Sequence, residues 1–462
     1  MRLSIKEYLT SLQGKKVAVI GIGVSNRPLI KLLLDHGVSV TACDKSEREN
    51  FDGFIESLEQ SGAQVRLGNG YLDDLTGFDV IFRTPGMRPD VPALEQARAA
   101  GAEITSEMEV FFDICPAPII AITGSDGKTT TTTMISGLLK AAGYRTFVGG
   151  NIGRPLLSDV SEMTEQDMVV LELSSFQLMT MGTSPHIAVV TNLAPNHLDV
   201  HTSMEEYVDA KRNICRHQNG TDRLILNWDN EIAHSFEHDS SAEVTFFSRH
   251  SKLLDGTYLR DDGMICVKGR PVLNTADILL PGVHNIENYM AAITAVDGLV
   301  ADEVIREYAK TFGGVEHRIE LVRELDGVRY YNDSIASSPT RTIAGLRSFR
   351  EKVILIAGGY DKNIPYDELG PEIIKHVKAL ILTGTTAEKI RMATVSAPDY
   401  NPEQLTIQMV DDFKDAILAA QEVALPGDIV LLSPASASFD RFRNFAERGN
   451  VFKEIVNHLK AK

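Results

Sequence analysis

Short runs of aliphatic and β-branched residues alternate with longer amphipathic stretches along the whole chain. This alternation is typical of α/β proteins, in which buried strands are joined by helices. The first unit predicts a strand from Lys16 to Ile20, a helix from Arg27 to His36 and a strand from Val38 to Cys43. A later strand, Val80 to Phe82, leads into the turn Thr84-Pro85-Gly86. The start of the chain therefore predicts a small Rossmann-like domain.

The middle of the chain contains three almost continuous apolar runs, Ile119 to Ile122, Met168 to Leu173 and Ile187 to Thr191. Such runs predict strands of a parallel sheet that is covered on both faces. Between about Asp222 and Leu280 the pattern changes to short alternating strands with polar turns. We expect this segment to form a small β appendage.

A third unit begins near Glu316-His317-Arg318. Its predicted buried strands are Val353 to Ala357, Leu380 to Thr383 and Ile429 to Leu432, and its closing helix is Arg441 to Lys460. The whole pattern predicts an α/β protein of three domains. These are a Rossmann-like N-terminal domain (residues 1–106), a central P-loop ATPase-type parallel sheet with a small β appendage (residues 107–315) and a Rossmann-like C-terminal domain (residues 316–462).

The composition narrows the classes of protein. A chain of 462 residues is too long for one hydrophobic core. Its net charge of -17 argues against a nucleic-acid or anionic-membrane partner, because phosphate groups are bound by surplus Lys and Arg. The four cysteines stand far apart without a CxxC pair, which argues against a disulfide framework and a thiolate zinc site. No run approaches the roughly 18 apolar residues of a membrane-spanning helix. Since the N-terminus has no signal-peptide pattern, we expect a cytoplasmic protein without membrane insertion.

A glycine loop, Gly124-Ser125-Asp126-Gly127-Lys128-Thr129-Thr130, stands between a predicted strand and a predicted helix. P-loops use this arrangement to present backbone N–H groups and a helix N-terminus to phosphates. Lys128 would reach the β- and γ-phosphates, and the Thr129 hydroxyl would bind Mg²⁺. Ile122 replaces the first glycine of the general P-loop pattern, so this is a shorter form. The loop predicts ATP binding, with the Asp126 carboxylate pointing out of the loop because it would repel phosphate.

Glu172 lies inside an otherwise apolar strand, just before Ser174-Ser175. A buried carboxylate is costly unless it is paired or binds a cation, and the carboxyl ends of parallel strands are where ligands bind. A magnesium ligand is therefore one interpretation, and a sheet-edge carboxylate with a solvated head is the other. His197 follows the next strand and is expected beyond the same strand ends as Glu172.

Lys211 lies on the apolar stripe of a helix predicted from Met204 to Cys215. Ser203 to Glu206 fit a capping box at the start of this helix. A lysine on a buried face needs a partner or must lose its charge. The alternative is a lysine at the edge of the stripe that extends its amine into water.

A second glycine loop, Gly21 to Asn26, imitates a dinucleotide-binding fingerprint, but Asn26 stands where the third glycine belongs. Asp44 ends the following strand. Alone, this pattern is compatible with an NAD-binding dehydrogenase. A complete ATP site in the next domain favours a UDP-linked substrate instead.

Seven motifs, taken in order, resemble those of the Mur ligase family, ATP-dependent enzymes that form amide bonds in cell-wall precursors. The motifs are Thr123 to Thr130, Gly149 to Gly153, Glu172 to Leu178, Asn192 to Asp199, Gly282 to Asn288, Glu316 to Arg318 and Asn332 to Ser334. Within the family, Ser433 to Asp440 with Phe445 and Arg448-Gly449 resembles the branch that adds D-glutamate.

The resemblance implies an enzyme that uses ATP and two Mg²⁺ ions to join D-glutamate to UDP-N-acetylmuramoyl-L-alanine through an acyl phosphate. It implies that a CO₂-derived carbamate forms on Lys211, and that Lys128, His197 and Lys211 act in catalysis. The metal ligands that it implies are Thr129, Glu172, His197 and Lys211. The ATP-binding residues that it implies are Gly124, Ser125, Asp126, Gly127, Lys128, Thr129, Thr130, Asn285, Asn288, Arg318 and Asp333. Those for the UDP-linked substrate are Ser25, Asn26, Asp44, Thr84, Pro85, Gly86 and Asn151, and those for glutamate are Ser337, Lys362, Ser438, Phe439 and Phe445.

One position departs from the family pattern, since Ile335 stands where many members of this branch have a lysine. Recognition of the glutamate carboxylates must then rest on Lys362, Ser337 and backbone donors. The alternatives are a sister ligase with another acceptor, such as L-glutamate or a folylpolyglutamate-type substrate, an NAD-binding dehydrogenase, and a catalytically silent nucleotide-binding protein. We expect a monomer whose partners are small molecules.

Overall fold

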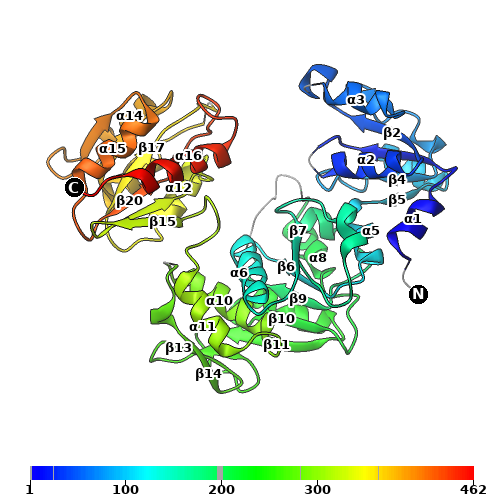
Figure 1. The fold of residues 1–462 in the computed structure, drawn as a ribbon, viewed down its shortest axis with the longest axis horizontal. Helices are drawn as coiled ribbons and strands as arrows, with labels where there is room; N and C mark the ends of the chain where they lie inside the picture. The colour runs from blue at the N-terminus through cyan, green and yellow to red at the C-terminus, as the bar shows by residue number, and fades with distance from the viewer. Residues whose placement is uncertain (1–2, 24, 52, 195–200, 281, 363) are drawn as a thin grey trace. The chain divides into compact units, whose positions relative to one another are not determined.

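The computed structural model describes the whole chain except residues 1–2, 24, 52, 195–200, 281 and 363. The chain divides into two compact units, Met1–Asp277 with Ile286–Tyr308 and Ile278–Asn285 with Ala309–Lys462. Three sheets of five, nine and six strands, each accompanied by helices, confirm the predicted α/β class (Figure 1). Within the described residues, no helix is long and apolar enough to cross a membrane.

The first sheet consists of parallel strands in the order β3-β2-β1-β4-β5. The chain builds outward from β1 through β2 to β3 and then returns to place β4 and β5 on the other side of β1. The loops after β1 and β4 therefore flank a topological switch point, which is where doubly wound sheets bind ligands. The strands are β1 (Lys16–Ile20), β2 (Ser39–Asp44), β3 (Gln64–Leu67), β4 (Val80–Phe82) and β5 (Glu103–Thr105). The helices are α1 (Ile5–Ser11), α2 (Asn26–Asp35), α3 (Phe54–Gln60), α4 (Pro92–Ala99) and α5 (Glu107–Ile114).

The central sheet has the order β14-β13-β12-β11-β10-β9-β6-β8-β7. Its strands are parallel from β7 to β12 and antiparallel from β12 to β14. The short strands expected between Asp222 and Leu280 are present, and they continue this sheet through the pairing of β9 with β10. The strands are β6 (Ile119–Thr123), β7 (Thr146–Gly150), β8 (Met168–Glu172), β9 (Ile187–Val190), β10 (Arg223–Asn227), β11 (Glu243–Ser248), β12 (Thr257–Leu259), β13 (Met264–Val267) and β14 (Arg270–Asn274). The helices are α6 (Lys128–Ala141), α7 (Ser175–Leu178), α8 (Met204–Arg212), α9 (Glu231–His234), α10 (Val283–Val296) and α11 (Asp302–Thr311).

The third sheet lies in the second unit and has the order β15-β16-β20-β17-β18-β19. Only the pair of β15 with β16 is antiparallel, and the other pairs are parallel. The strands are β15 (Glu320–Leu325), β16 (Val328–Asn332), β17 (Val353–Ala357), β18 (Val377–Leu382), β19 (Thr406–Met409) and β20 (Ile429–Leu432). The helices are α12 (Pro339–Leu346), α13 (Leu369–His376), α14 (Ala387–Val395), α15 (Phe413–Val423) and α16 (Phe445–His458).

Two helices start or end away from their predicted positions. Helix α16 begins at Phe445 and not at Arg441, since the Asn444 side chain accepts a hydrogen bond from the Glu447 backbone (2.9 Å). Helix α8 ends at Arg212, before the predicted Cys215, and Asn213 caps it. Ser203 caps the start of α8 as expected. The carboxylate of Glu206, however, turns to Thr202 and Arg88 and does not complete the predicted capping box.

Hydrophobic packing explains why the first two sheets share one compact unit. A single cluster of buried side chains extends from Val19 in β1 and Ile30 in α2, through Phe111 in α5, to Val169 in β8. Burial of apolar area is the main stabilising term in folding, at about 25 cal/mol per Å². In the second unit, one cluster covers each face of the sheet, with Leu355 on one side and Ile354 on the other.

Candidate active site

The glycine loop after β6 depends on two glycines with left-handed backbone angles. Gly124 has φ 150°, and a Cβ atom there would lie 2.0 Å from Thr191 Oγ1. Gly127 has φ 78° and caps α6, and a Cβ atom there would lie 2.3 Å from Asn288 Oδ1. L-residues rarely adopt such angles, and neither position has room for a side chain. These contacts keep the loop close to the ends of β9 and α10.

Asp126 takes part in the loop through its backbone. Its N–H donates to Asn192 Oδ1 (3.0 Å), and its carbonyl accepts hydrogen bonds from Thr191 Oγ1 (2.6 Å) and Asn192 Nδ2 (3.3 Å). The residue itself is exposed to solvent, which agrees with the prediction that its carboxylate points out of the loop.

Two lysine amines share one carbonyl oxygen of this loop. Lys128 Nζ donates to Gly124 O (2.9 Å) and Ser125 O (2.8 Å). Lys211 Nζ, from α8, donates to the same Gly124 O (3.0 Å) and to Thr123 Oγ1 (3.0 Å). The helix pattern had placed Lys211 on the buried face, and the structure confirms this with 2% exposure.

The environment of Lys211 favours its neutral form. Burial lowers its pKa well below the ordinary value, and the nearby charge of Lys128 lowers it further, while Glu172 acts in the opposite direction. The amine also lies 4.9 Å from the centre of the Tyr207 ring. A buried, unprotonated amine is a nucleophile at neutral pH, which is the chemistry that addition to CO₂ requires.

Glu172 ends β8 beside the glycine loop and is 2% exposed. Thr129 Oγ1 donates to its Oε2 (2.7 Å), and Asn151 Nδ2 donates to its Oε1 (2.8 Å). The Asn151 N–H also donates to the Glu172 carbonyl (2.7 Å). Gly150 (φ 93°) makes this approach possible, because a Cβ atom there would lie 2.1 Å from that carbonyl oxygen. Both carboxylate oxygens thus accept hydrogen bonds from neutral donors.

A hydroxyl network closes the far side of the loop. Ser125 Oγ donates to Ala194 O (2.9 Å) and lies 3.0 Å from Tyr207 Oη. Buried His201 lies 2.8 Å from Ser175 Oγ through Nε2 and stacks on Phe176 with ring centres 5.2 Å apart. His197, the predicted ligand and catalytic residue, lies outside the described residues.

The first sheet holds its predicted substrate residues at the switch point. Asn26 is buried and donates to Ile20 O and Gly21 O (3.0 Å each). Asp44 accepts from the N–H groups of Ile22 (2.7 Å) and Ser46 (2.9 Å). Its carboxylate thus orders the glycine loop of this sheet.

The remaining predicted substrate residues lie around the same switch point. Ser25 is exposed at the start of α2, and Thr84-Pro85-Gly86 follows β4. A Cβ atom at Gly21 would lie 2.9 Å from Thr84 Cβ, so the turn and the glycine loop touch.

The predicted ATP-binding residues outside the glycine loop lie in both compact units. In the first unit, buried Asn288 accepts a hydrogen bond from Thr131 Oγ1 (3.4 Å), next to the glycine loop. Buried Asn285, exposed Arg318 and buried Asp333 lie in the second unit. Burial raises the pKa of Asp333 to about 7, against the opposing effects of its hydrogen bond from Ser433 Oγ (2.8 Å) and the charge of Arg318.

Arg448 organises the predicted glutamate segment of the second unit. It is 2% exposed, and it donates to Ser334 through Nε (to Oγ, 3.0 Å) and Nη2 (to O, 2.9 Å). Its Nη1 donates to Ser436 O (3.1 Å) and Ala437 O (3.0 Å). Burial lowers the pKa of Arg448 to about 10. The guanidinium therefore fixes the backbone that leads into Ser438.

The other predicted glutamate residues differ in exposure. Ser438 is buried, Phe439 (60%) and Phe445 (38%) are exposed, Ser337 is half-buried and Lys362 is exposed.

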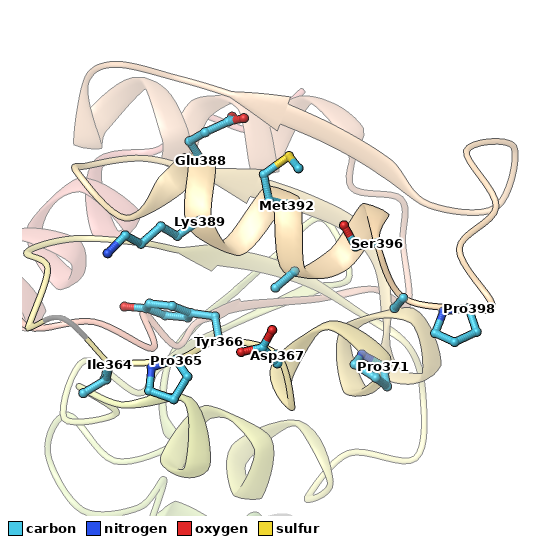
Figure 2. A pocket seen from close by; sticks show the side chains of 12 residues that line it. Ile364, Pro365, Tyr366, Asp367, Pro371, Glu388, Lys389, Met392, Ser396 and Pro398 are labelled. Atoms are coloured by element: carbon cyan, nitrogen blue, oxygen red, sulfur yellow. The ribbon is translucent and has the colours of Figure 1, made fainter.

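A separate groove of about 540 Å³ lies between α13 and α14 (Figure 2). Tyr366, Lys389 and Met392 line it, and none of the predicted glutamate residues does. It is therefore not part of the predicted site.

Several residues of the site were not predicted from the sequence. Arg83 donates to Pro85 O, Thr191 Oγ1 donates to Asp126 O, and His201 bonds to Ser175 in the motif that begins at Glu172. Arg83 carried a usable signal, since it extends the apolar strand Val80–Phe82 into the Thr84 turn as Glu172 extends its own strand. Thr191 and His201 act through contacts distant in sequence, and no local pattern marks them.

Comparison with known families agrees with this geometry. The chain matches the MurD-like N-terminal domain of Mur ligases over residues 15–106, the Mur ligase middle domain over residues 122–296 and the glutamate ligase domain over residues 317–436. The protein therefore belongs to the Mur ligase family. This membership rules out the NAD-binding dehydrogenase as an alternative.

The similarity to individual members extends over the whole chain. The chain is 53% identical over 466 residues to the UDP-N-acetylmuramoylalanine--D-glutamate ligase of Acetivibrio thermocellus, with 100% of both chains covered. It is 52% identical over 459 residues to the enzyme of the same name from Clostridium novyi, with 99% of this chain and 100% of that one covered. Among solved structures, MurF from Acinetobacter baumannii has a TM-score of 0.61 at 14% identity, with 99% of both chains covered, and shows the shared fold.

Proposed function

We propose that this protein is an ATP-dependent ligase that joins D-glutamate to UDP-N-acetylmuramoyl-L-alanine in the synthesis of peptidoglycan precursors. The observation that carries the proposal is full-length identity of 50–53% to ligases of that name. The site chemistry supports it, because a phosphate loop, a buried carboxylate and a buried amine converge within one unit. That set suits transfer of a phosphoryl group better than hydride transfer.

The first chemical step is activation of the substrate's alanyl carboxylate. One carboxylate oxygen attacks the γ-phosphorus of ATP, the bond to the β-phosphate oxygen breaks, and ADP and an acyl phosphate result. In this proposal, Lys128 and the N–H groups at the start of α6 stabilise charge on the phosphoryl oxygens. Activation is needed because an unmodified carboxylate has no good leaving group.

The second step forms the amide bond. The glutamate amine attacks the acyl carbon, a tetrahedral intermediate forms, and phosphate leaves as the nitrogen loses its proton. The domain roles that we propose are UDP-substrate binding for residues 1–106, ATP binding for residues 107–315, and glutamate binding with closure on ATP for residues 316–462. Closure would protect the acyl phosphate from water.

The residues present fit a magnesium site. Thr129 and Glu172 supply hard oxygen donors 2.7 Å apart, and Mg²⁺ prefers such donors. Within the described part of the chain, no three His, Cys, Asp or Glu side chains gather as a metal cluster. A carbamate on Lys211 would add the missing carboxylate, so Thr129, Glu172, His197 and carbamylated Lys211 would hold two Mg²⁺ ions. When bound, these ions stabilise the negative charge that develops on the phosphoryl oxygens.

The test is release of phosphate from ATP with UDP-N-acetylmuramoyl-L-alanine and one of three acceptors, D-glutamate, L-glutamate or lysine. We expect turnover with D-glutamate only. Turnover with L-glutamate or lysine would support a sister ligase instead, and no substrate-dependent release would reject the enzyme assignment.

The matched variant for this assay is Lys128→Ala. We expect it to lose phosphate release while its affinity for the UDP-linked substrate stays unchanged, since that substrate binds to another domain. Lys140→Ala, an exposed change in the last turn of the same helix, serves as the control. Loss of UDP-substrate binding in Lys128→Ala would contradict the proposed division between domains.

A further inference from the structure

Arg83 is a buried arginine that follows β4, beside the topological switch point of the first sheet. It is 2% exposed. Its Nη1 donates to the carbonyl oxygens of Thr84 (3.2 Å), Pro85 (3.1 Å) and Met87. Its Nη2 donates to Thr180 Oγ1 (3.0 Å), just after α7 of the central domain. One guanidinium thus holds a turn of one domain and binds to the next domain.

A guanidinium in this position is costly unless its bonds are fully used. Burial lowers the pKa of Arg83, and the charge of Glu109 opposes this effect. Glu109 is therefore a nearby counter-charge for the buried guanidinium. The planar fork of arginine matches several acceptors at once, which a lysine amine cannot do.

The bonds to Arg83 fix the position of the turn. Carbonyl oxygens of an irregular turn have no sheet partner and need another donor when they are covered. Because Arg83 holds these oxygens, Thr84 stays against the Gly21 loop. A Cβ atom at Gly21 would lie only 2.9 Å from Thr84 Cβ. The shape of the crevice between the loops after β1 and β4 therefore depends on Arg83.

The segment after this turn has a second attachment to the central domain. Arg88 Nη2 pairs with Glu206 Oε1 (2.7 Å) in α8, the helix that carries Lys211. Glu206 also accepts from the Thr202 N–H (2.6 Å). This pair is partly exposed and is screened by solvent, so the buried bond from Arg83 to Thr180 is the stronger constraint.

We propose that Arg83 is a positioning residue, which fixes the Thr84-Pro85-Gly86 turn for the nucleotide end of the substrate and sets the distance from that turn to the phosphate loop. This inference rests on the proposed function for the identity of the substrate. The position of the crevice itself follows from the strand order.

The first test is titration calorimetry of UDP on the full-length Arg83→Lys variant. Lysine keeps the charge but cannot bond to three carbonyls and to Thr180 together. We expect UDP to bind at least about tenfold more weakly, which is the effect of roughly one lost charge-assisted hydrogen bond. The affinity for ATP should stay within twofold of the wild-type value. Arg48→Lys, an exposed change in the same domain, is the control. A folded Arg83→Lys protein that binds UDP like the wild type would overturn the inference.

The second test separates the two roles of Arg83 through Thr180→Val. This change removes the acceptor in the central domain and leaves the turn intact. We expect unchanged UDP affinity and a kcat that falls about tenfold with the complete substrate. An unchanged kcat in Thr180→Val would refute the coupling between domains. If Arg83→Lys does not fold, the kcat of Thr180→Val decides whether the inference stands. Failure of the wild type to bind UDP would instead reject the proposed substrate, which keeps the two failures distinct.

Discussion

Replacing Lys211 by methionine separates the chemistry of this residue from its contribution to stability. The change removes two hydrogen bonds of 3.0 Å, to Thr123 Oγ1 and Gly124 O. Both acceptors keep another partner, because Thr123 Oγ1 bonds to Leu173 O and Gly124 O accepts from Lys128. At about 1 kcal/mol for each bond, the expected loss is about 2 kcal/mol, and the methionine side chain fills the apolar stripe.

The difference in stability between the wild type and Lys211→Met should depend on pH with a definite sign. Because the folded-state pKa of Lys211 is lowered from 10.5, the unfolded chain holds the extra proton between the two pKa values. The resulting cost of burial is full below the folded pKa and disappears as the pH rises toward 10.5. In CO₂-free buffer, the wild type should therefore gain stability relative to Lys211→Met as the pH rises toward 10.5. The fluorescence of Trp228, the only tryptophan of the chain, reports unfolding of this unit.

The activity of the same variant tests the proposed carbamate. We expect no phosphate release from Lys211→Met, and partial recovery with added formate or acetate in the smaller Lys211→Ala, where the acid can replace the carbamate. ¹³C-bicarbonate should give a carbamate signal in the wild type that is absent from both variants. Lys140→Met is the control. The reasoning is refuted if Lys211→Met stays active. It is also refuted if the free energy of unfolding of this variant falls by much more than about 4 kcal/mol and the loss does not change with pH.

Three further predictions concern backbone, buried charge and titration. Gly150→Ala should lower the free energy of unfolding by at least about 2 kcal/mol and raise the Mg²⁺ requirement, because its Cβ would lie 2.1 Å from the Glu172 carbonyl oxygen and displace it. Thermal unfolding and Mg²⁺ titration check this, and Gly182→Ala, where a Cβ meets open space, is the neutral control. Arg448→Lys should raise the KM for glutamate at least about tenfold and leave that for ATP unchanged, since it loses most of four hydrogen bonds that order the glutamate segment. The stability that wild type has relative to Asp333→Asn should be greatest below pH 4 and fall as the pH rises to about 7, as measured by hydrogen exchange of β16, because burial raises the pKa of that carboxyl; a flat difference would contradict it.

The elements of the fold that could be predicted are those with strong periodicity. Apolar runs located β6, β8 and β9, and the same logic identified Glu172 as a polar residue inside a buried strand. Spacing predicted that Lys211 lies on the apolar stripe of its helix, with an edge position as the alternative, and its 2% exposure decides for the buried position. These predictions succeed because burial imposes a repeating pattern on neighbouring residues.

Contacts between distant segments could not be predicted in this way. Arg83 meets Thr180 across 97 positions of the chain, and Arg448 meets Ser334 across 114. Nothing in the local sequence of an arginine shows which carbonyl oxygens will surround it. The capping box predicted at the start of α8 failed for a similar reason, since whether Glu206 caps α8 or pairs with Arg88 depends on a segment distant in sequence.

The shared carbonyl of Gly124 links the two lysines of the phosphate site. With Lys128 resting on this oxygen, burial first and the adjacent charge second keep the Lys211 amine neutral. Nucleotide phosphates would draw Lys128 away and bring negative charge, and both changes favour protonation of Lys211. With the proposed carbamate, addition of CO₂ would be easiest before the nucleotide binds. The carbamate would then place negative charge beside Glu172, and Mg²⁺ would offset that charge before the phosphates enter. The proposed function therefore predicts the order CO₂, then metal, then ATP.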